Sequence, residues 1–323
     1  MQRRDVLRTG AAALGTLGAG WLNPARAQPQ TISIVMPVGG GTGGDTSARV
    51  LADVVARKLK SAVIIENRPG ADTMIANQYV LNGPTDGGRV LFISPSSMVI
   101  LPLVNKNLDF NPQTQLQPVI LTSRGGAALM VKSERFKTIE EFIAEARKEP
   151  GKISLATYGG HYYKLLALMI QRELGIHLNS VPYKDPTPAI SNVIGGNVDA
   201  MLIDAGSARE FVRSGKTRVI ALTHERRPDI FNDVPTFKEM GYPQLVSYIW
   251  IGYAVKAGTP PDMVSRLYQA FSSALKSKEY MDYMAATNSG AETIDFNSEQ
   301  ALQYIDGERK RFAALIEKTG YTV

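Results

Sequence analysis

The chain has 323 residues, of which 44% are hydrophobic and 20% charged, and its formal net charge is +6. This composition has no strong bias and predicts an ordinary globular protein that is long enough for two domains. The absence of cysteine excludes disulfides, thiolate nucleophiles and cysteine-ligated metals. The three histidines are widely spaced and fit no metal-binding motif, so we expect no metal and no cofactor.

Residues 1–27 have the features of a twin-arginine-type export signal. Arg3 and Arg4 form the arginine pair, an apolar stretch runs to Leu22, and Ala27 ends an A-x-A cleavage site. The apolar stretch is too short and too rich in alanine and glycine for a membrane span. Cleavage near Ala27 would remove four arginines and one aspartate and lower the net charge from +6 to +3. We therefore expect a periplasmic protein, and nothing supports nucleic-acid binding.

Residues 31–59 predict a short strand, a glycine-rich loop and a helix, in that order. The strand is rich in β-branched residues, and Asp45 stands at the expected N-cap of the helix. Backbone N–H groups at the start of a helix bind anions, so this loop is predicted to hold an anion by amides rather than by a charged side chain. The alternative is a flexible connection capped by Asp45. The candidate binding residues are Gly41, Thr42, Gly43, Gly44 and Asp45.

The same stretch is also compatible with a dinucleotide-binding domain. Gly39, Gly41 and Gly44 satisfy G-x-G-x-x-G, and Glu66 ends the next predicted strand near the spacing of a ribose-binding acid. Two features count against this reading: the adjacent glycines make a looser turn, and Asp45 would repel a pyrophosphate. The residues alone leave the alternative open.

The next segments continue the alternation of strands and helices. We expect strands over 62–66 and 89–94, with a helix over 72–81 between them. This order is typical of a parallel α/β sheet, whose ligands gather at the C-terminal ends of the strands. The hydroxyl groups that follow the strand over 89–94 are therefore candidate ligand contacts: Ser94, Ser96 and Ser97.

We next expect two separate strands, over 116–123 and 127–133, and then a helix over 139–151. A second unit comes after this helix. The strand over 153–156, the loop with Gly159 and Gly160 and the helix after it repeat the opening pattern and predict a unit that faces the first across a cleft. Further strands are expected over 177–183, 198–204 and 218–224. Asp204 ends one of them beside the predicted cleft. A strand over 245–255 would return to the first domain, and two long helices would follow.

The order of seven motifs resembles the Bug-type solute-binding proteins of tripartite tricarboxylate transporters: GTGGDTSAR, ENRPGA, PTDGG, VPYK, IGGNVD, DVPTF and AGTPPD. The resemblance runs from about Thr31 to the C-terminus. It implies a two-lobed, periplasmic-binding-protein-like α/β fold with two crossover strands and a ligand cleft between the lobes. Lobe 1 would comprise residues 28–126 plus 249–323, and lobe 2 residues 127–248. The resemblance also accounts for the glycines and Glu66 without a dinucleotide.

In that family a small carboxylate is held by backbone amides and hydroxyls from loops of both lobes. This chain departs from the pattern, because the second loop usually contains small residues and here contains Tyr158, His161 and Tyr162. Our hypothesis is an aromatic or heterocyclic carboxylate stacked on Tyr158 or Tyr162. The alternative is that these rings point outward or pack on the following helix. The candidate residues of this second side are Thr157, Tyr158, Gly159, Gly160, His161, Tyr162, Tyr183 and Asp204.

The resemblance implies a monomeric extracytoplasmic solute-binding protein that delivers its ligand to the membrane subunits of a tripartite tricarboxylate-type transporter. No catalytic motif is present, and we expect no enzymatic activity. Two alternatives remain from other functional classes. One is a twin-arginine-exported NAD(P)-dependent oxidoreductase that uses the Gly39/Gly41/Gly44 loop and Glu66. The other is a ligand-sensing partner of a signalling system.

Overall fold

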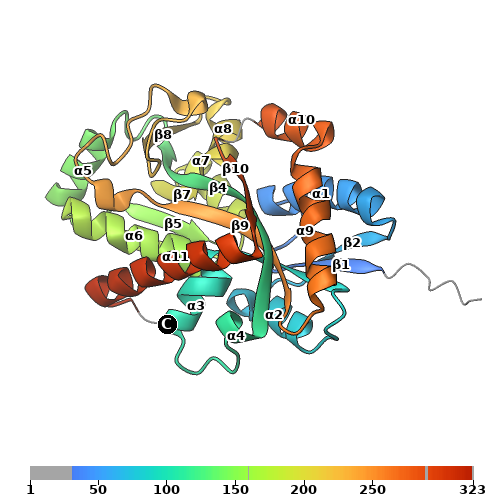
Figure 1. Cartoon of the computed structure of the whole chain (residues 1–323). Helices are drawn as coiled ribbons and strands as arrows, with labels where there is room; N and C mark the ends of the chain where they lie inside the picture. Colours follow the sequence, from blue (N-terminus) through green and yellow to red (C-terminus); the bar gives the residue numbers. More distant parts are fainter. Residues whose placement is uncertain (1–30, 159, 288–289, 322–323) are drawn as a thin grey trace, which may run out of the picture. The chain divides into compact units, whose positions relative to one another are not determined.

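A computed structural model describes residues 31–158, 160–287 and 290–321 (Figure 1). The expected export signal, residues 1–27, lies outside the described residues, and so does Gly159. In the described ranges, no helix combines the length and the apolar character that a bilayer crossing requires. The strands of these ranges form one continuous sheet, with the main order β2-β1-β3-β9-β4-β7-β5-β6 and with β8 and β10 also paired to β4.

One group of strands contains the beginning and the end of the described chain. In it, β1 (Ile32–Met36) pairs in parallel with β2 (Val63–Asn67) and β3 (Arg89–Ile93). Strand β9 (Tyr248–Lys256) lies antiparallel between β3 and β4, and β10 (Glu292–Asn297) pairs antiparallel with β4. We call these strands, with the first part of β4, the first strand group.

Strand β4 (Leu116–Lys132) is one element where the sequence predicted two, and that prediction is wrong (Figure 1). Gly125 and Gly126 remain extended because they pair with Ile249 and Tyr248 of β9. Gly126 has no room for a side chain, since a Cβ there would lie 2.4 Å from Nδ1 of His224. The strand changes partners immediately afterwards.

From Ala127 onward, β4 pairs antiparallel with β7 (Ala200–Asp204) and β8 (Thr217–Leu222). Strand β5 (Ser154–Tyr158) pairs in parallel with β7 and with β6 (Asn179–Tyr183). These strands and the end of β4 form the second strand group. Each group therefore has a parallel part, as predicted, but the sheet as a whole is mixed.

The helices alternate with the strands, and most begin near a polar residue of the expected type. Thr138 caps α5 by accepting from the backbone N–H of Glu141, and Asn297 and Gln300 form a capping box at α11. Sequence reasoning missed α3, α4, α8, α10 and β10. The helices are α1 (Gly43–Leu59), α2 (Met74–Leu81), α3 (Leu101–Val104), α4 (Pro112–Gln115), α5 (Ile139–Lys148), α6 (His161–Leu174), α7 (Pro186–Gly195), α8 (Ala205–Val212), α9 (Pro261–Leu275), α10 (Lys278–Thr287) and α11 (Ser298–Thr319).

The core of the first strand group lies on both faces of β9. Trp250 and Tyr253 are fully buried on this strand. Tyr253 stacks on Phe271 of α9 with ring centroids 4.5 Å apart, whereas Trp250 meets Tyr304 of α11 edge-on. This apolar packing holds β9 in place and so fixes the ends of the neighbouring strands, where the candidate binding loops begin.

Candidate functional site

The loop between β1 and α1 begins the helix earlier than the sequence suggested. Thr42 is the N-cap, because its Oγ1 accepts a hydrogen bond of 3.3 Å from the backbone N–H of Asp45. The expected N-cap role of Asp45 is therefore wrong, since Gly43 and Gly44 adopt helical conformations and place Asp45 inside the first turn. At Gly44 a side chain would approach the ring of Phe92 to 3.2 Å.

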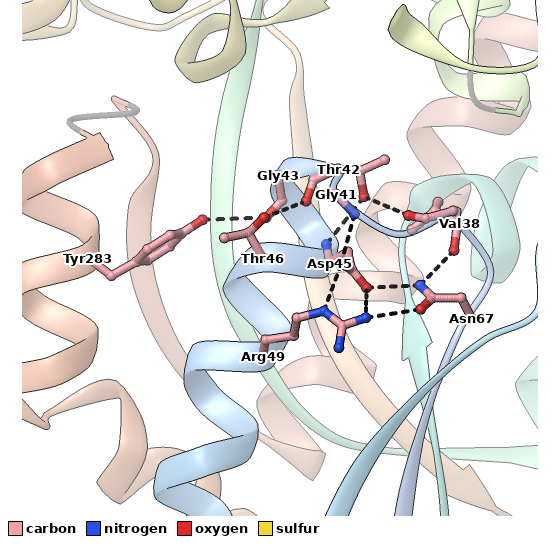
Figure 2. Close-up of polar contacts among 10 residues, drawn as sticks. Val38, Gly41, Thr42, Gly43, Asp45, Thr46, Arg49, Asn67 and Tyr283 are labelled. Carbon is pink, nitrogen blue, oxygen red and sulfur yellow. Dashed lines mark hydrogen bonds and ion pairs between the residues drawn. The ribbon is translucent and has the colours of Figure 1, made fainter.

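Asp45 instead organises the loop from within (Figure 2). Its carboxylate accepts from Arg49 Nε at 2.9 Å, from Asn67 Nδ2 at 2.8 Å and from the backbone N–H of Gly41 at 2.9 Å. Burial by itself would raise the pKa of Asp45. The hydrogen bonds and the positive charge of Arg49 lower the pKa by more than burial raises it, so that it lies below its ordinary value. The carboxylate is thus charged and fully engaged by protein donors.

The start of α1 still offers several backbone donors. Among the described residues, the N–H groups of Thr42, Gly43 and Gly44 have no hydrogen-bond partner. First-turn amides of any helix lack an intrahelical acceptor, and the helix dipole favours an anion beside them. Because Arg49 forms an ion pair with Asp45, the negative charge of this carboxylate does not repel an anion at the start of the helix.

Glu66 is engaged in a similar way and is not available to a ribose. It accepts a hydrogen bond from the hydroxyl of Ser33 and forms an ion pair of 3.0 Å with Arg68. Burial raises the pKa of Glu66, but the bonds from Ser33 and Arg68 outweigh it and lower the pKa below its ordinary value. A dinucleotide would need the carboxylate of Glu66 as the acceptor for its ribose hydroxyl, and this carboxylate is already bound to Ser33 and Arg68.

The three serines after β3 have different partners. The hydroxyl of Ser97 accepts from the backbone N–H of Ser94 at 3.1 Å and donates to the carbonyl of Ser94 at 3.2 Å. These two bonds close a turn. Ser96 is buried, and its Oγ accepts from the backbone N–H of Tyr162 at 3.3 Å. Ser96 therefore links the turn after β3 to the first turn of α6.

Tyr158, at the end of β5, lies beside Asp204. Its hydroxyl is 3.5 Å from Oδ2 of Asp204 and 3.4 Å from the hydroxyl of Tyr163, and the two rings pack with centroids 4.8 Å apart. Burial, with the nearby Asp204 charge, raises the pKa of Tyr158, so this phenol is neutral. Thr157, the preceding residue, is buried, and its Oγ1 has no partner within the described ranges.

His161 and Tyr162 pack away from Asp204. Nδ1 of His161 lies 3.0 Å from the hydroxyl of Tyr321, and its ring is 1% exposed. Tyr162 donates to Oγ of Ser247 at 2.9 Å and meets Phe312 of α11 edge-on. Of the three rings singled out in the sequence, the structure places Tyr158 beside Asp204, whereas Tyr162 contacts the candidate Ser96 through its backbone N–H.

Asp204 and Tyr183 complete the second side. Asp204 caps α8, with Oδ1 accepting from the backbone N–H of Ser207 at 2.8 Å. The hydroxyl of Tyr183 accepts from Asn192 at 3.0 Å, and Tyr183 is the register partner of Tyr158 across β5 and β6. The described candidates of this side therefore gather at the C-terminal ends of β5, β6 and β7.

The two sides approach each other closely. A Cβ on Gly43 would lie 3.8 Å from Oγ of Ser207, and one on Gly39 would lie 3.9 Å from Oδ1 of Asp185. The hydroxyl of Tyr283, on α10, donates to the carbonyl of Gly43 at 3.4 Å (Figure 2). Sequence reasoning missed Ser207 and Tyr283. The position of Ser207 just after Asp204 was a usable signal for the first, whereas nothing in the sequence pointed to the second.

Two surface hollows lie elsewhere. One, of about 310 Å³, is lined by the starts of α9 and α11, and the other, of about 610 Å³, lies along α5. Neither is lined by a candidate residue. The polar loops between the two strand groups, rather than these hollows, form the candidate site.

Sequence comparisons match this chain to known proteins over most of its length. The family model described as "Tripartite tricarboxylate transporter family receptor" matches residues 47–321. Protein BugT of Bordetella pertussis is 29% identical over 91% of this chain and 90% of its own length. The UPF0065 protein in the gbd 5' region of Cupriavidus necator is 31% identical over 99% and 98%.

Structural comparisons agree on the fold and confirm the predicted periplasmic-binding-protein-like architecture. The periplasmic binding protein BugD is 28% identical, with a TM-score of 0.82 over 90% of this chain and 97% of its own. Two structures from Rhodopseudomonas palustris share the fold at lower identity. MatC with bound malate has a TM-score of 0.81 at 24% identity over 88% and 98% of the chains, and Rpa4515 with adipate has 0.84 at 23% over 90% and 98%. None of these proteins is named as a dinucleotide-dependent oxidoreductase, and that alternative has no support.

Proposed function

The chain belongs to the tripartite tricarboxylate transporter receptor family, and we propose that it is a periplasmic solute-binding protein for a small carboxylate. It would deliver this solute to the membrane subunits of a tripartite tricarboxylate-type transporter. Export would use residues 1–27, with cleavage near Ala27, and the mature protein would act as a monomer without enzymatic activity. The similar protein BugD is a periplasmic binding protein, and this supports a periplasmic location.

The observation that carries the proposal is the set of free amides at the start of α1. The N–H groups of Thr42, Gly43 and Gly44 have no partner among the described residues, and Arg49 pairs with Asp45. Gly43 lies close to the first turn of α8, since a Cβ on Gly43 would come within 3.8 Å of Oγ of Ser207. A carboxylate at this place would receive backbone hydrogen bonds and the favourable end of the helix dipole.

We further propose that the two strand groups are the two lobes, residues 28–126 plus 249–323 and residues 127–248. The change of β4 partners between Gly126 and Ala127 supports the first boundary, and the start of β9 at Tyr248 supports the other. Closure of the lobes would bury the solute and create the surface that the transporter recognises. A sensing role would use the same closure.

The test is thermal unfolding of the protein with a panel of aliphatic and aromatic carboxylates, including malate, adipate and benzoate, and with NAD and NADP. A carboxylate at about 100 times its Kd adds roughly 2.7 kcal/mol to the free energy of unfolding, which raises Tm by several degrees. We expect a shift with at least one carboxylate and none with either nucleotide. A shift with NAD or NADP alone would contradict the proposal.

A further inference from the structure

Asp204 differs in its surroundings from the other carboxylates near the candidate site. Asp45 pairs with Arg49, and Glu66 pairs with Arg68. Among the described residues, Asp204 forms no ion pair. Oδ1 accepts the N–H of Ser207, and Oδ2 has only the hydroxyl of Tyr158 at 3.5 Å, which is a long and weak hydrogen bond. Half of this carboxylate is thus without a strong donor.

The position of Asp204 makes this deficit relevant to a bound solute. It begins α8, and Ser207 of the same helix turn lies opposite Gly43 of α1. The hydroxyl of Tyr283 donates to the carbonyl of Gly43. The Asp204 charge also acts on this tyrosine, because burial, Tyr280 and Asp204 together raise the pKa of Tyr283 to about 12. Asp185, near Gly39, forms no ion pair within the described ranges, but it is exposed to water and screened by it.

The site is therefore asymmetric. One side presents backbone donors at the start of α1, and the other presents a half-buried acceptor, Oδ2 of Asp204. A donor on the solute would complete the hydrogen bonding of Asp204, whereas a second carboxylate at the same place would meet a like charge in a partly desolvated environment.

We propose that Asp204 determines specificity: the solute is a carboxylate with an ammonium or hydroxyl group at its other end, and a plain dicarboxylate is disfavoured. This inference rests on the proposed carboxylate-binding function and narrows it to amino- and hydroxycarboxylates.

The test compares carboxylates of equal length that differ only in the far group. One series is butyrate, 4-aminobutyrate, 4-hydroxybutyrate and succinate, and a longer one is hexanoate, 6-aminohexanoate and adipate. Affinities are measured by calorimetry for the wild type and for Asp204→Asn. Asparagine caps a helix as well as aspartate does, so this change removes the charge and keeps α8 capped. Asp204→Ser, which also keeps a cap, serves if the first variant does not fold.

In the wild type we expect the amino or hydroxy compound of at least one series to bind ten times more tightly than the dicarboxylate of the same length. Asp204→Asn should reduce that ratio at least tenfold. The control Asp262→Asn removes an exposed charge from the first turn of α9, away from the site, and should leave the ratio unchanged.

The outcomes separate this inference from the function on which it rests. Binding with an unchanged ratio in Asp204→Asn, or a wild-type preference for the dicarboxylates, overturns the role of Asp204 and leaves the carboxylate-binding function standing. Failure of every carboxylate in both series and in the wider panel overturns both.

Discussion

The backbone N–H of Tyr162 donates to Oγ of Ser96, and this bond joins the turn after β3 to the first turn of α6. Ser96 follows a strand of the first group, and Tyr162 follows β5 of the second group. Beside them, Gly160 has a φ of +77°, and a Cβ on it would lie 3.1 Å from Oγ of Ser96. The approach of the two loops therefore depends on a residue without a side chain.

Gly160→Ala should lower the free energy of unfolding by about 2–3 kcal/mol, because the backbone conformation is nearly confined to glycine and the new methyl group meets Ser96. Gly175→Ala is the matched control. Gly175 also has a positive φ, +61°, but in the described part of the chain only its immediate chain neighbours lie within 4 Å of its Cβ position. It should lose only about 1 kcal/mol. Equal losses in urea unfolding would show that the Ser96 contact does not matter.

The neighbouring glycines of α1 should respond in opposite ways. Gly43→Ala has room for its methyl group and gains helix propensity, so its stability should stay constant or rise by up to about 1 kcal/mol. Gly44→Ala meets the Phe92 ring and should lose about 1–3 kcal/mol. Denaturant midpoints of the two variants, measured together, test this. A larger loss for Gly43→Ala would mean that the loop is not arranged as described.

Asp45 should stabilise the fold only while it is ionised. Its pKa is lowered in the folded state, so its contribution is complete above the unfolded pKa of about 3.9 and is lost as the pH falls through the folded value. Asp45→Asn should cost about 1–3 kcal/mol at pH 7, because the bonds from Arg49 and Gly41 weaken. The difference from the wild type should narrow below pH 4 in a series of urea titrations. A constant difference from pH 7 to pH 3 would contradict the charged state.

His224 should act in a different pH window. Burial lowers its pKa from 6.5 to about 4, and its Nε2 accepts from the N–H of Gly126. A histidine with a lowered pKa is neutral when folded, so stability is complete above about pH 6.5 and falls by up to about 3 kcal/mol as the pH drops to 4. His161, whose pKa is also lowered by burial, adds to the same slope.

His224→Gln should therefore flatten the dependence of the unfolding free energy on pH between 6.5 and 4 without removing it. His177→Gln is the control, since this histidine is neither buried nor near Gly126. An unchanged slope in His224→Gln would show that this ring is not held neutral by the fold.

Local sequence signals predicted most of the fold. The alternation of strands and helices and the caps at Thr138 and Asn297 are confirmed by the structure, because each depends on residues within one or two turns. The single strand β4 was not predicted, because its glycines resemble a break until their pairing with β9 is known. Helix α10 was missed because it follows α9 closely and has a weak apolar pattern.

The candidate site was predictable only in part, because some of its contacts join elements that are distant in the sequence. The glycine loop and its free amides follow from residues close in sequence. Asn67, which binds Asp45, comes from the end of β2, and Tyr283, which reaches Gly43, comes from α10. Their positions depend on packing between distant elements. Which of Tyr158, His161 and Tyr162 would face Asp204 likewise depended on side-chain packing against α11 and Ser247.

The insertion of β9 between β3 and β4 also sets the order in which the chain can complete its fold. The second strand group uses residues 127–222, which are continuous in sequence and can pair as soon as they are synthesised. The first group must wait, because β3 and β4 are separated until residues 248–256 are available to join them. Such a distant pairing is slow, since a long loop must close first. The half of the molecule that begins the described chain is thus the half that is finished last.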